Sequence, residues 1–167
     1  MMADHLEQGA LSAASVMGDG GNELRVERKE AKDATIDDLL NADGYLFCAP
    51  ENLASLSGEM KEFFDRTYYG AFQTREEPSY SEDSILVGRP YGLVIAAGSD
   101  GSSAAKQVER ICQGWRLKPV ADSLVWRNGL RQTKENILMP KTCLPDDAIE
   151  RCEEIGGRVA AVLMLQE

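Results

Sequence analysis

The sequence predicts an α/β fold with an open parallel sheet, and three observations support this class. Segments with helical periodicity alternate with strand-like segments along most of the chain. The two clearest strands, Tyr45–Ala49 and Tyr91–Ala97, are apolar on both faces, as central strands of a parallel sheet are. Each of them leads through a loop of small and polar residues into an amphipathic helix, and this order requires right-handed crossovers.

Length and composition are those of one globular domain over residues 1–167. The chain is 43% hydrophobic, which suffices for one sizeable core. Its 18 Lys and Arg against 28 Asp and Glu give a net charge of -10, which disfavours nucleic acid and anionic membranes as partners. No apolar run is long enough to span a bilayer, and Met1–Glu7 has no signal-peptide pattern, so we expect a cytoplasmic protein. The composition leaves open whether the protein forms a homo-oligomer.

The sequence disfavours disulfide, metal and triad chemistry. The four cysteines are scattered and include no Cys-x-x-Cys pair: Cys48, Cys112, Cys143 and Cys152. Their spacing indicates buried free thiols in a reducing compartment. Because His5 is the single histidine, neither a histidine-based metal site nor a Ser-His-Asp triad is expected.

The N-terminal region is expected to form a helix, a strand and a short second helix. Apolar residues recur at helical spacing in the first turns, at Leu6, Ala10, Ala13 and Met17. The cluster Gly18–Asn22 ends this helix, and alternating apolar and charged residues predict a half-exposed strand over Leu24–Arg28. Thr35 is placed to cap a short helix through Leu40, because its hydroxyl can accept an amide hydrogen bond.

The rest of the chain continues the alternation. The first buried strand is followed by a helix with one apolar face, carried by Met60, Phe63, Phe64 and Thr67. Residues 73–87 are polar and predict an extended surface loop. The helix after the second buried strand has an inner stripe that continues to Trp115, so we assign this tryptophan to the core. A third strand over Ser123–Arg127 and a final helix beginning at Pro145 complete the pattern.

The segment after the first buried strand carries the most specific motif of the chain. Loop A, residues 50–58, reads Pro-Glu-Asn-Leu-Ala-Ser-Leu-Ser-Gly and precedes the helical motif Lys61-x-Phe63-Phe64-Asp65-Arg66. This strand, loop and helix resemble the FMN-dependent NAD(P)H:quinone reductase and flavodoxin group, and the resemblance covers nearly the whole chain. It implies a flavodoxin-like fold, a three-layer α/β architecture with an open parallel sheet. It also implies that Asp65 and Arg66 pair or dock the helix rather than act in catalysis.

The resemblance further implies that one strand is missing from this chain. A flavodoxin-like chain begins with a strand and a phosphate loop rich in Ser, Thr and Gly, whereas this chain opens inside the first helix. The strand order 2-1-3-4-5 places the missing strand between Leu24–Arg28 and Tyr45–Ala49. We therefore expect a gap beside Tyr45–Ala49, or a shift of Leu24–Arg28 into the vacated place. A start codon assigned too far downstream is the expected cause, and a truncated protein is the alternative.

Two loops form the candidate cofactor site. In the resembled group, loop A runs along the isoalloxazine ring of FMN, which makes its candidates Pro50, Glu51, Asn52, Leu53, Ala54 and Ser55. Small residues let the backbone approach a ring, and the proline is expected to fix the turn that leaves the strand. Loop B, residues 98–103, follows the second buried strand, and the resemblance directs it to the pyrimidine side of the flavin through Gly98, Ser99, Asp100 and Gly101. Both loops should border one crevice at the carboxyl edge of the sheet.

Two features set limits on flavin binding. Glu51 and Asn52 stand where the resembled group more often has uncharged or aromatic residues, and a carboxylate beside a reduced flavin is unfavourable unless it points away. Nothing in Met1–Glu7 replaces the amides and hydroxyls of a phosphate loop. We therefore expect the chain as given to bind FMN weakly or not at all, and an N-terminally extended form to bind it. Tyr68 and Tyr69 are candidates for a pocket wall.

The function implied by the resemblance is flavin chemistry. NAD(P)H would deliver hydride to FMN, and the reduced flavin would pass electrons to a quinone or similar acceptor. No side chain is required as an acid or base, because the cofactor carries the redox chemistry. Two alternatives remain open: an electron-carrier flavodoxin, which the acidic charge suits, and a cofactor-free domain with a binding role, which the missing phosphate loop supports.

Overall fold

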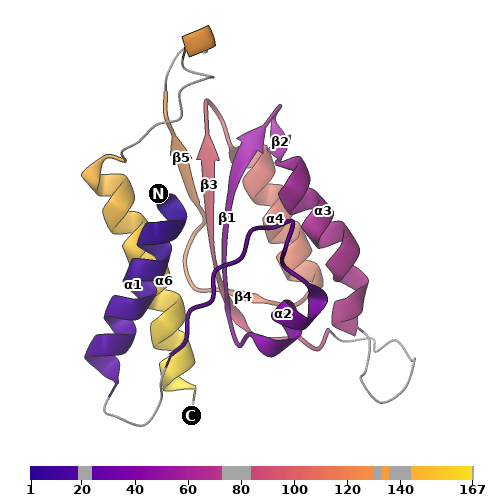
Figure 1. Cartoon of the computed structure of the whole chain (residues 1–167), viewed down its shortest axis with the longest axis vertical. Coiled ribbons are helices and arrows are strands. Elements are labelled where there is room, and N and C mark those ends of the chain that lie inside the picture. The colour runs from indigo at the N-terminus through magenta and orange to yellow at the C-terminus, as the bar shows by residue number, and fades with distance from the viewer. Residues whose placement is uncertain (19–23, 73–83, 130–132, 136–143, 167) are drawn as a thin grey trace.

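A mostly parallel sheet forms the centre of the molecule (Figure 1) in the computed structural model, which describes residues 1–18, 24–72, 84–129, 133–135 and 144–166. The strands run in the order β2-β1-β3-β4, and β5 also pairs with β3. Their bounds are Tyr45–Asn52 for β1, Ser55–Leu56 for β2, Pro90–Ala97 for β3, Lys118–Pro119 for β4 and Leu124–Arg127 for β5. Among the described strands only β2 is antiparallel, as it returns from the end of β1. The predicted parallel α/β sheet is confirmed.

Helices cover both faces of this sheet and complete three layers (Figure 1). The helices of one face are α1 (Met2–Met17) and α6 (Asp146–Leu165). The other face is covered by α2 (Ile36–Asn41), α3 (Gly58–Thr67), the 3-10 helix η1 (Tyr68–Phe72) and α4 (Ser102–Gly114). Trp115 is fully buried on the α4 side, stacked against the ring of Tyr68 with 5.8 Å between centroids, which confirms its place in the core. Burial of such large apolar side chains is the main driving force for the fold.

Two glycines allow α1 and α6 to pack with their backbones in contact. A Cβ atom on Gly9 would lie 2.0 Å from the carbonyl oxygen of Glu153. A Cβ atom on Gly156 would lie 1.9 Å from the carbonyl oxygen of Leu6. No side chain fits at such distances, so this helix pair requires glycine at both positions. The pair fixes α1 against α6 and so places it on this face of the sheet.

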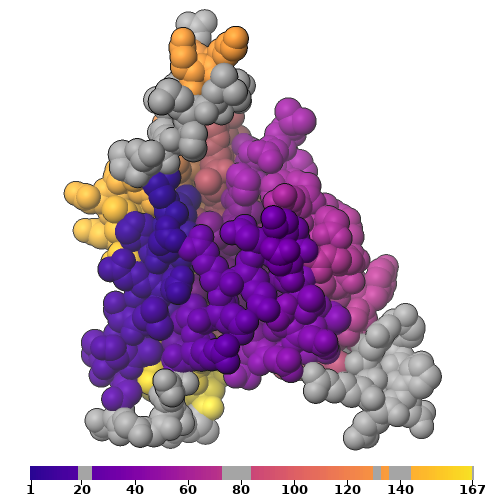
Figure 2. All heavy atoms as spheres, viewed as in Figure 1, coloured from indigo at the N-terminus to yellow at the C-terminus, as the bar shows by residue number. Residues whose placement is uncertain are grey.

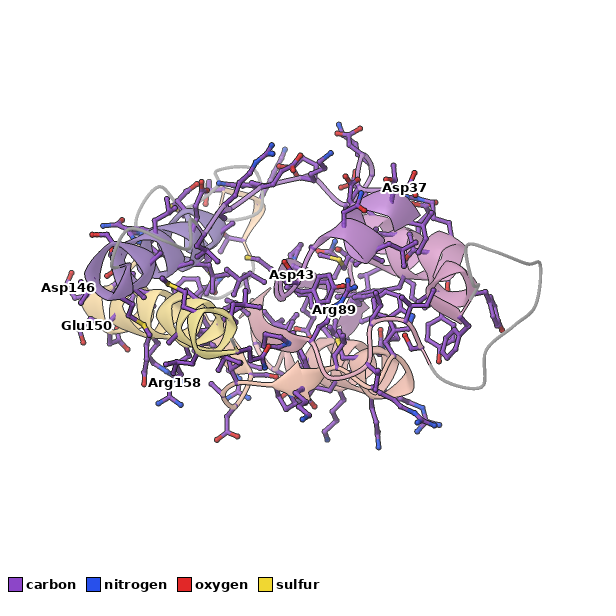
Figure 3. All side chains as sticks on the ribbon, turned by 90° about the horizontal axis from the view of Figure 1, so that it is seen from below. Asp37, Asp43, Arg89, Asp146, Glu150 and Arg158 are labelled. Carbon is purple, nitrogen blue, oxygen red and sulfur yellow. The ribbon has the colours of Figure 1, made fainter. Side chains whose placement is uncertain are left out.

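Polar contacts fix both ends of α2. The hydroxyl of Thr35 accepts from the N–H of Asp38 at 3.3 Å, and the Asp38 carboxylate accepts from the N–H of Thr35 at 2.7 Å. This capping box confirms the predicted helix start. At the other end, the guanidinium of Arg89 donates to the carbonyls of Leu39 at 2.9 Å and Leu40 at 3.1 Å. Figure 3 shows Arg89 near Asp43, viewed from below the sheet. These contacts place α2 beside the start of β1.

The expected strand over Leu24–Arg28 is wrong. These residues form an irregular segment that crosses in front of β1 on its way to α2 (Figure 1). Within the described part of the chain, no backbone hydrogen bond joins residues 24–30 to β1. A strand needs a paired neighbour, and this segment has none, so its alternating sequence does not become extended sheet. The alternative that it slides against Tyr45–Ala49 is thereby excluded, and a gap remains.

Smaller expectations are corrected as well. Pro50 lies inside β1 opposite Ala96 rather than in a turn, and its carbonyl accepts from the N–H of Ser57 on the side away from β3. The strand tolerates this proline because the missing N–H faces the unpaired side. Ser84 and Leu86 are buried while Ile85 and Val87 are exposed, so the end of the expected surface loop is exposed only in part; residues 73–83 lie outside the described residues. The short β4 had no recognisable pattern in the sequence.

Candidate functional site

Loop A is a β-hairpin rather than a simple strand-to-helix connection. β1 continues to Asn52, the chain turns through Leu53 and Ala54, and β2 returns with Ser55 opposite Asn52. Leu53 and Ala54 have positive φ angles of 51° and 57°. This is the backbone of a two-residue turn of the type I′ class, which Asn and Gly usually fill. A leucine and an alanine in this conformation store backbone strain at the centre of loop A.

The hairpin is attached to α4 through one amide side chain. The Oε1 atom of Gln107 accepts from the N–H of Leu56 at 3.2 Å, and it lies 3.2 Å from the hydroxyl of Ser55. At the turn itself, the side chain of Leu53 is fully exposed. The hairpin therefore has a fixed base and an exposed apolar tip.

Loop B begins α4 and contacts loop A directly. Gly101 is the N-cap of α4, with φ of 72°, and its N–H donates to the Glu51 carboxylate at 2.9 Å. A Cβ atom at Gly101 would lie 2.4 Å from a methyl group of Val125, so both the backbone conformation and the space require glycine. The carbonyl of Asp100 accepts from the guanidinium of Arg127 at 2.7 Å, which fixes loop B to the end of β5.

The two loops meet at the carboxyl edge of the sheet, as predicted. β1 and β3 are parallel neighbours, and Figure 1 shows the ends of both strands at the same side of the molecule. The prediction that Asn52–Ser55 and Ser99–Gly101 border a common cavity is not confirmed by the cavity found in the described residues. A cavity of about 870 Å³ is lined by Pro50 and Ser57 from loop A, but by none of residues 52–55 and none of loop B. Loops A and B are joined by the hydrogen bond between Glu51 and Gly101, while this cavity lies along residues 45–50 of β1 and reaches Ala96 of β3 and Trp126 of β5.

This cavity occupies the expected position of the missing strand. Its walls come from α1, from residues 26–35 and from the edge of β1, with Met60 and Phe63 of α3 behind them. Figure 2 shows the N-terminal part of the chain covering this side of the molecule. The expectation of a gap beside Tyr45–Ala49 is therefore confirmed.

Charged groups surround the first turn of α1. Asp4 pairs with the N-terminal amino group of Met1 and with the guanidinium of Arg28. These two contacts lower the pKa of Asp4 to about 2. Helix N-termini favour anions because their first N–H groups lack partners, and here Asp4 supplies that anion. This arrangement had no motif in the sequence, because Arg28 reaches Asp4 from 24 residues away.

The site fits one part of FMN and not the other. Loops A and B present backbone and small side chains at the carboxyl edge, where the ring of a flavin would lie. The Glu51 carboxylate is directed to the amide of Gly101, which satisfies the condition that it point away from a ring. The phosphate meets no loop of amides and hydroxyls in the described N-terminal residues, and the Asp4 carboxylate stands in the first turn of α1. The Met1 amino group and Arg28, the two cations at this helix start, are both engaged by Asp4 rather than presented to a phosphate.

Most residues of the resembled helix motif have structural roles. Arg66 donates to the carbonyls of Ala31 at 2.6 Å and Lys32 at 3.3 Å, which docks α3 on the segment before α2. Asp65 forms an exposed pair with Lys61 on the same helix. Among the described residues, the hydrogen bonds and ion pairs of Arg66 and Asp65 lie within α3 or on residues 31–34 rather than on loops A and B, in agreement with a docking role. Of the two tyrosines, Tyr68 packs on Trp115 and Tyr69 is 68% exposed, and neither lines the large cavity.

Solved structures place this architecture in the flavodoxin-like class. A flavodoxin from the domain Archaea matches with a TM-score of 0.65 and 13% identity, over 97% of this chain and 87% of that chain. The two-electron reduced flavodoxin of Megasphaera elsdenii matches with 0.61 and 18%, over 96% and 88%. An oxidoreductase from Corynebacterium diphtheriae matches with 0.59 and 19%, over 99% and 87%. At these identities the likeness defines the fold.

The family follows from the sequence comparison. The model of the NADPH-dependent FMN reductase family matches residues 8–130, and the chain belongs to this family. No curated protein matches the sequence. In the described residues no helix is long and apolar enough to cross a membrane, and no group of three or more His, Cys, Asp or Glu side chains could hold a metal ion.

Proposed function

We propose that this protein is an FMN-dependent NAD(P)H oxidoreductase with a quinone or a similar small molecule as acceptor. The observation that carries the proposal is the junction of loops A and B through Glu51 and Gly101, in a chain of the reductase family. When bound, FMN would supply the redox chemistry by taking hydride from NAD(P)H and passing two electrons to the acceptor. The side chains then act in binding and orientation, and no residue is assigned as an acid or base.

The candidate binding residues divide into two roles. Backbone and small side chains at the hairpin turn would border the ring edge: Pro50, Glu51, Asn52, Leu53, Ala54 and Ser55. Loop B would border the pyrimidine side with Gly98, Ser99, Asp100 and Gly101. Gln107 is added to the predicted set as a positioning residue, because it holds the returning strand of the hairpin. Its role could not be expected from the sequence, since a half-buried glutamine beside the apolar stripe of a helix has no distinctive pattern.

The proposal is tested with riboflavin, which carries the ring without the phosphate. Quenching of riboflavin fluorescence measures binding to the wild type and to the Ala54→Trp variant. The indole would fill the space in front of the turn, so we expect at least a tenfold loss of affinity. Val16→Trp is the matched control. Val16 lies on α1 and is 85% exposed, so this variant should bind riboflavin as the wild type does. Equal binding by Ala54→Trp would show that loop A is an ordinary connection.

Catalysis is tested in the same solutions. NADPH and NADH oxidation is followed with saturating riboflavin and menadione as the quinone probe. We expect protein-dependent oxidation that Ala54→Trp abolishes and Val16→Trp retains. If the protein binds riboflavin but does not oxidise NADPH or NADH, the proposed reductase activity is refuted.

The acidic composition supports one alternative function. A net charge of -10 suits an electron carrier that docks to a basic partner. A carrier binds flavin but does not oxidise NAD(P)H without a partner reductase, so the two measurements above separate it from an enzyme. The position of Asp4 supports a second alternative, a cofactor-free binding domain. Such a domain would quench the fluorescence of neither riboflavin nor FMN.

A further inference from the structure

Cationic side chains gather on the outer side of α4 and on β4 after it. Residues 106–118 contain four Lys and Arg and one Glu, whereas the whole chain has a net charge of -10. Lys106 and Arg110 are exposed and lie four residues apart on α4, so they are neighbours on one side of the helix. Arg116 and Lys118 follow the helix and are also exposed. An acidic protein thus presents one local basic region.

The structure does not explain this positive charge by internal contacts. Among the described residues, no ion pair or side-chain hydrogen bond involves Lys106, Arg110 or Lys118. The one acidic residue of the region, Glu109, accepts from the hydroxyl of Ser123 at 2.7 Å. The dipole of α4 does not account for Lys106 and Arg110 either, because its effect is confined to the last turn.

Arg116 stands where the backbone favours glycine. It follows α4 with a φ angle of 58°, and helices commonly end in a glycine or asparagine of this left-handed conformation. The conformation is less stable for arginine than for glycine, because the Cβ atom comes too close to the backbone. The chain therefore places a cation at a position where glycine would relieve strain.

Two exposed apolar side chains adjoin these cations. Tyr69 is 68% exposed and Val87 is 55% exposed. Backbone hydrogen bonds connect their segments: the N–H of Ile85 donates to the carbonyl of Ala71 in η1 at 2.7 Å, and the residue after Val87 donates to the carbonyl of Arg116 at 2.8 Å. Tyrosine and arginine are enriched at protein interfaces. The two apolar residues and the four cations are named the α4 surface: Tyr69, Val87, Lys106, Arg110, Arg116 and Lys118.

The combination of charge and apolar side chains selects the kind of partner. A second copy that docked symmetrically by this surface would bring like charges together. Nucleic acid and anionic bilayers extend well beyond the α4 surface, where the acidic remainder of the chain repels them. A short acidic segment pairs with the cations alone, and apolar residues within it would cover Tyr69 and Val87.

We propose that the α4 surface is a docking site for a short acidic segment of a partner protein that also carries apolar side chains. Its carboxylates pair with the cations along α4 and β4, which gives the contact its orientation and its dependence on salt. Its apolar side chains cover the exposed ring and the valine beside the end of α4. The inference is independent of the proposed flavin chemistry, because it uses no residue of loops A and B.

A labelled peptide tests this docking on the full chain. The probe is fluorescein-Asp-Glu-Leu-Glu-Tyr-Asp-Glu-Val, and its binding is measured by fluorescence anisotropy at low salt, where charges are screened least. One control peptide replaces each Asp and Glu with Asn and Gln, and a second replaces each apolar residue with Ser. A labelled oligothymidylate of the same length is the nucleic-acid control.

Matched variants separate the α4 surface from net charge and from stability. Arg110→Glu and Arg151→Glu change the net charge equally, but Arg151 lies exposed on α6, on the other face of the sheet. Val87→Ser and Val16→Ser remove the same apolar side chain from two exposed positions. Arg116→Gly removes a cation and relieves the left-handed residue, so its Tm should equal or exceed that of the wild type.

The expected result is saturable binding of the probe and a loss of affinity of at least about fivefold in Arg110→Glu and about threefold in Val87→Ser and Arg116→Gly. Arg151→Glu and Val16→Ser should bind as the wild type does, and both control peptides should bind at least about fivefold more weakly. No saturable binding, or equal losses in the two charge-reversal variants, would overturn the proposal.

Two other occupants are also distinguished. Oligothymidylate or the serine peptide binding as tightly as the probe would overturn the proposal, because a general site for polyanions explains both. Residues 73–83, outside the described residues, include four acidic side chains: Glu76, Glu77, Glu82 and Asp83. If the probe binds only after these four are replaced by Gln and Asn, the chain's own segment occupies the α4 surface and the proposal is overturned.

Discussion

The carboxylate of Glu51 accepts a hydrogen bond from the backbone N–H of Gly101, with 2.9 Å between Oε1 and N. This bond joins loop A to loop B at the first turn of α4. The carboxylate lies where the helix dipole favours a negative charge. The same bond directs the charge of Glu51 toward the helix, so the residue that departs from the resembled family serves to join the two candidate loops.

Substitution of Glu51 tests the contribution of this bond. Glu51→Ala leaves the Gly101 amide without its partner and is expected to lower the free energy of unfolding by about 1–2 kcal/mol. Glu51→Gln retains an acceptor without the charge and should cost about half as much. Urea denaturation of the three proteins measures the difference. A wild-type midpoint for Glu51→Ala would show that the bond is exchanged for water at no cost.

The close contact between α1 and α6 predicts that one added methyl group lowers the stability of the fold strongly. Gly156→Ala places a carbon against the Leu6 carbonyl, and Gly9→Ala does the same against Glu153, so each should destabilise the fold by about 3 kcal/mol. Gly58→Ala is the matched control, since a Cβ atom there meets nothing within 4 Å. It should be neutral or slightly stabilising, because alanine favours helix. Thermal unfolding of the three variants provides the measurement, and equal Tm values would contradict the packing described.

Acid should weaken the contacts of Asp38. Hydrogen bonds from Lys29 and Thr35 lower the pKa of Asp38 to about 2, from 3.8. A lowered native pKa gives stability that is present above the unfolded pKa and is lost as pH falls through the native one. The free energy of unfolding should therefore decline between about pH 4 and pH 2. Asp38→Asn should be less stable at pH 7 and show a shallower decline. Parallel curves for the two proteins would assign the acid effect to other groups.

The docking of α3 through Arg66 predicts that substitutions of the neighbouring residues Arg66 and Asp65 change the free energy of unfolding by different amounts. Arg66→Ala removes the donors to the carbonyls of Ala31 and Lys32, and should lower the free energy of unfolding by about 1–2 kcal/mol. Asp65→Asn breaks only an exposed pair with Lys61 and should change it by less than about 0.5 kcal/mol. Both should retain the flavin affinity of the wild type. A loss of affinity in either variant would place α3 in the binding site, which this account excludes.

Patterns of local sequence predicted most of the fold. The two-faced apolar runs gave β1 and β3, and helical stripes gave α1, α3, α4 and α6, since burial on known faces fixes these elements. The Leu24–Arg28 expectation failed because alternation describes a strand only when a neighbour is available. β4, with two residues, has too few positions for any period.

The site could be predicted less well than the fold. Loop positions after parallel strands follow from topology, so the approach of loops A and B was foreseeable. The turn at Leu53 and Ala54 was not, because neither residue is typical of a left-handed backbone. The pairing of Arg28 with Asp4 depends on tertiary distance alone. Ion pairs between exposed residues that are far apart in the sequence leave no recognisable pattern in it.

We infer that loops A and B would hold the ring edge of a flavin, whereas the described N-terminal residues offer no loop of amides and hydroxyls for its phosphate. The most direct measurement compares riboflavin and FMN dissociation constants for the same protein by fluorescence quenching at low salt. We predict measurable riboflavin binding and an FMN affinity that is equal or lower. Asp4→Asn should then improve FMN binding about two- to fivefold, because it releases the Met1 amino group and Arg28, and should leave uncharged riboflavin unchanged. Glu7→Gln removes a nearby charge without breaking these ion pairs and should have a smaller effect on FMN. FMN binding at least tenfold tighter than riboflavin would contradict the account, because it would reveal a phosphate site in this chain.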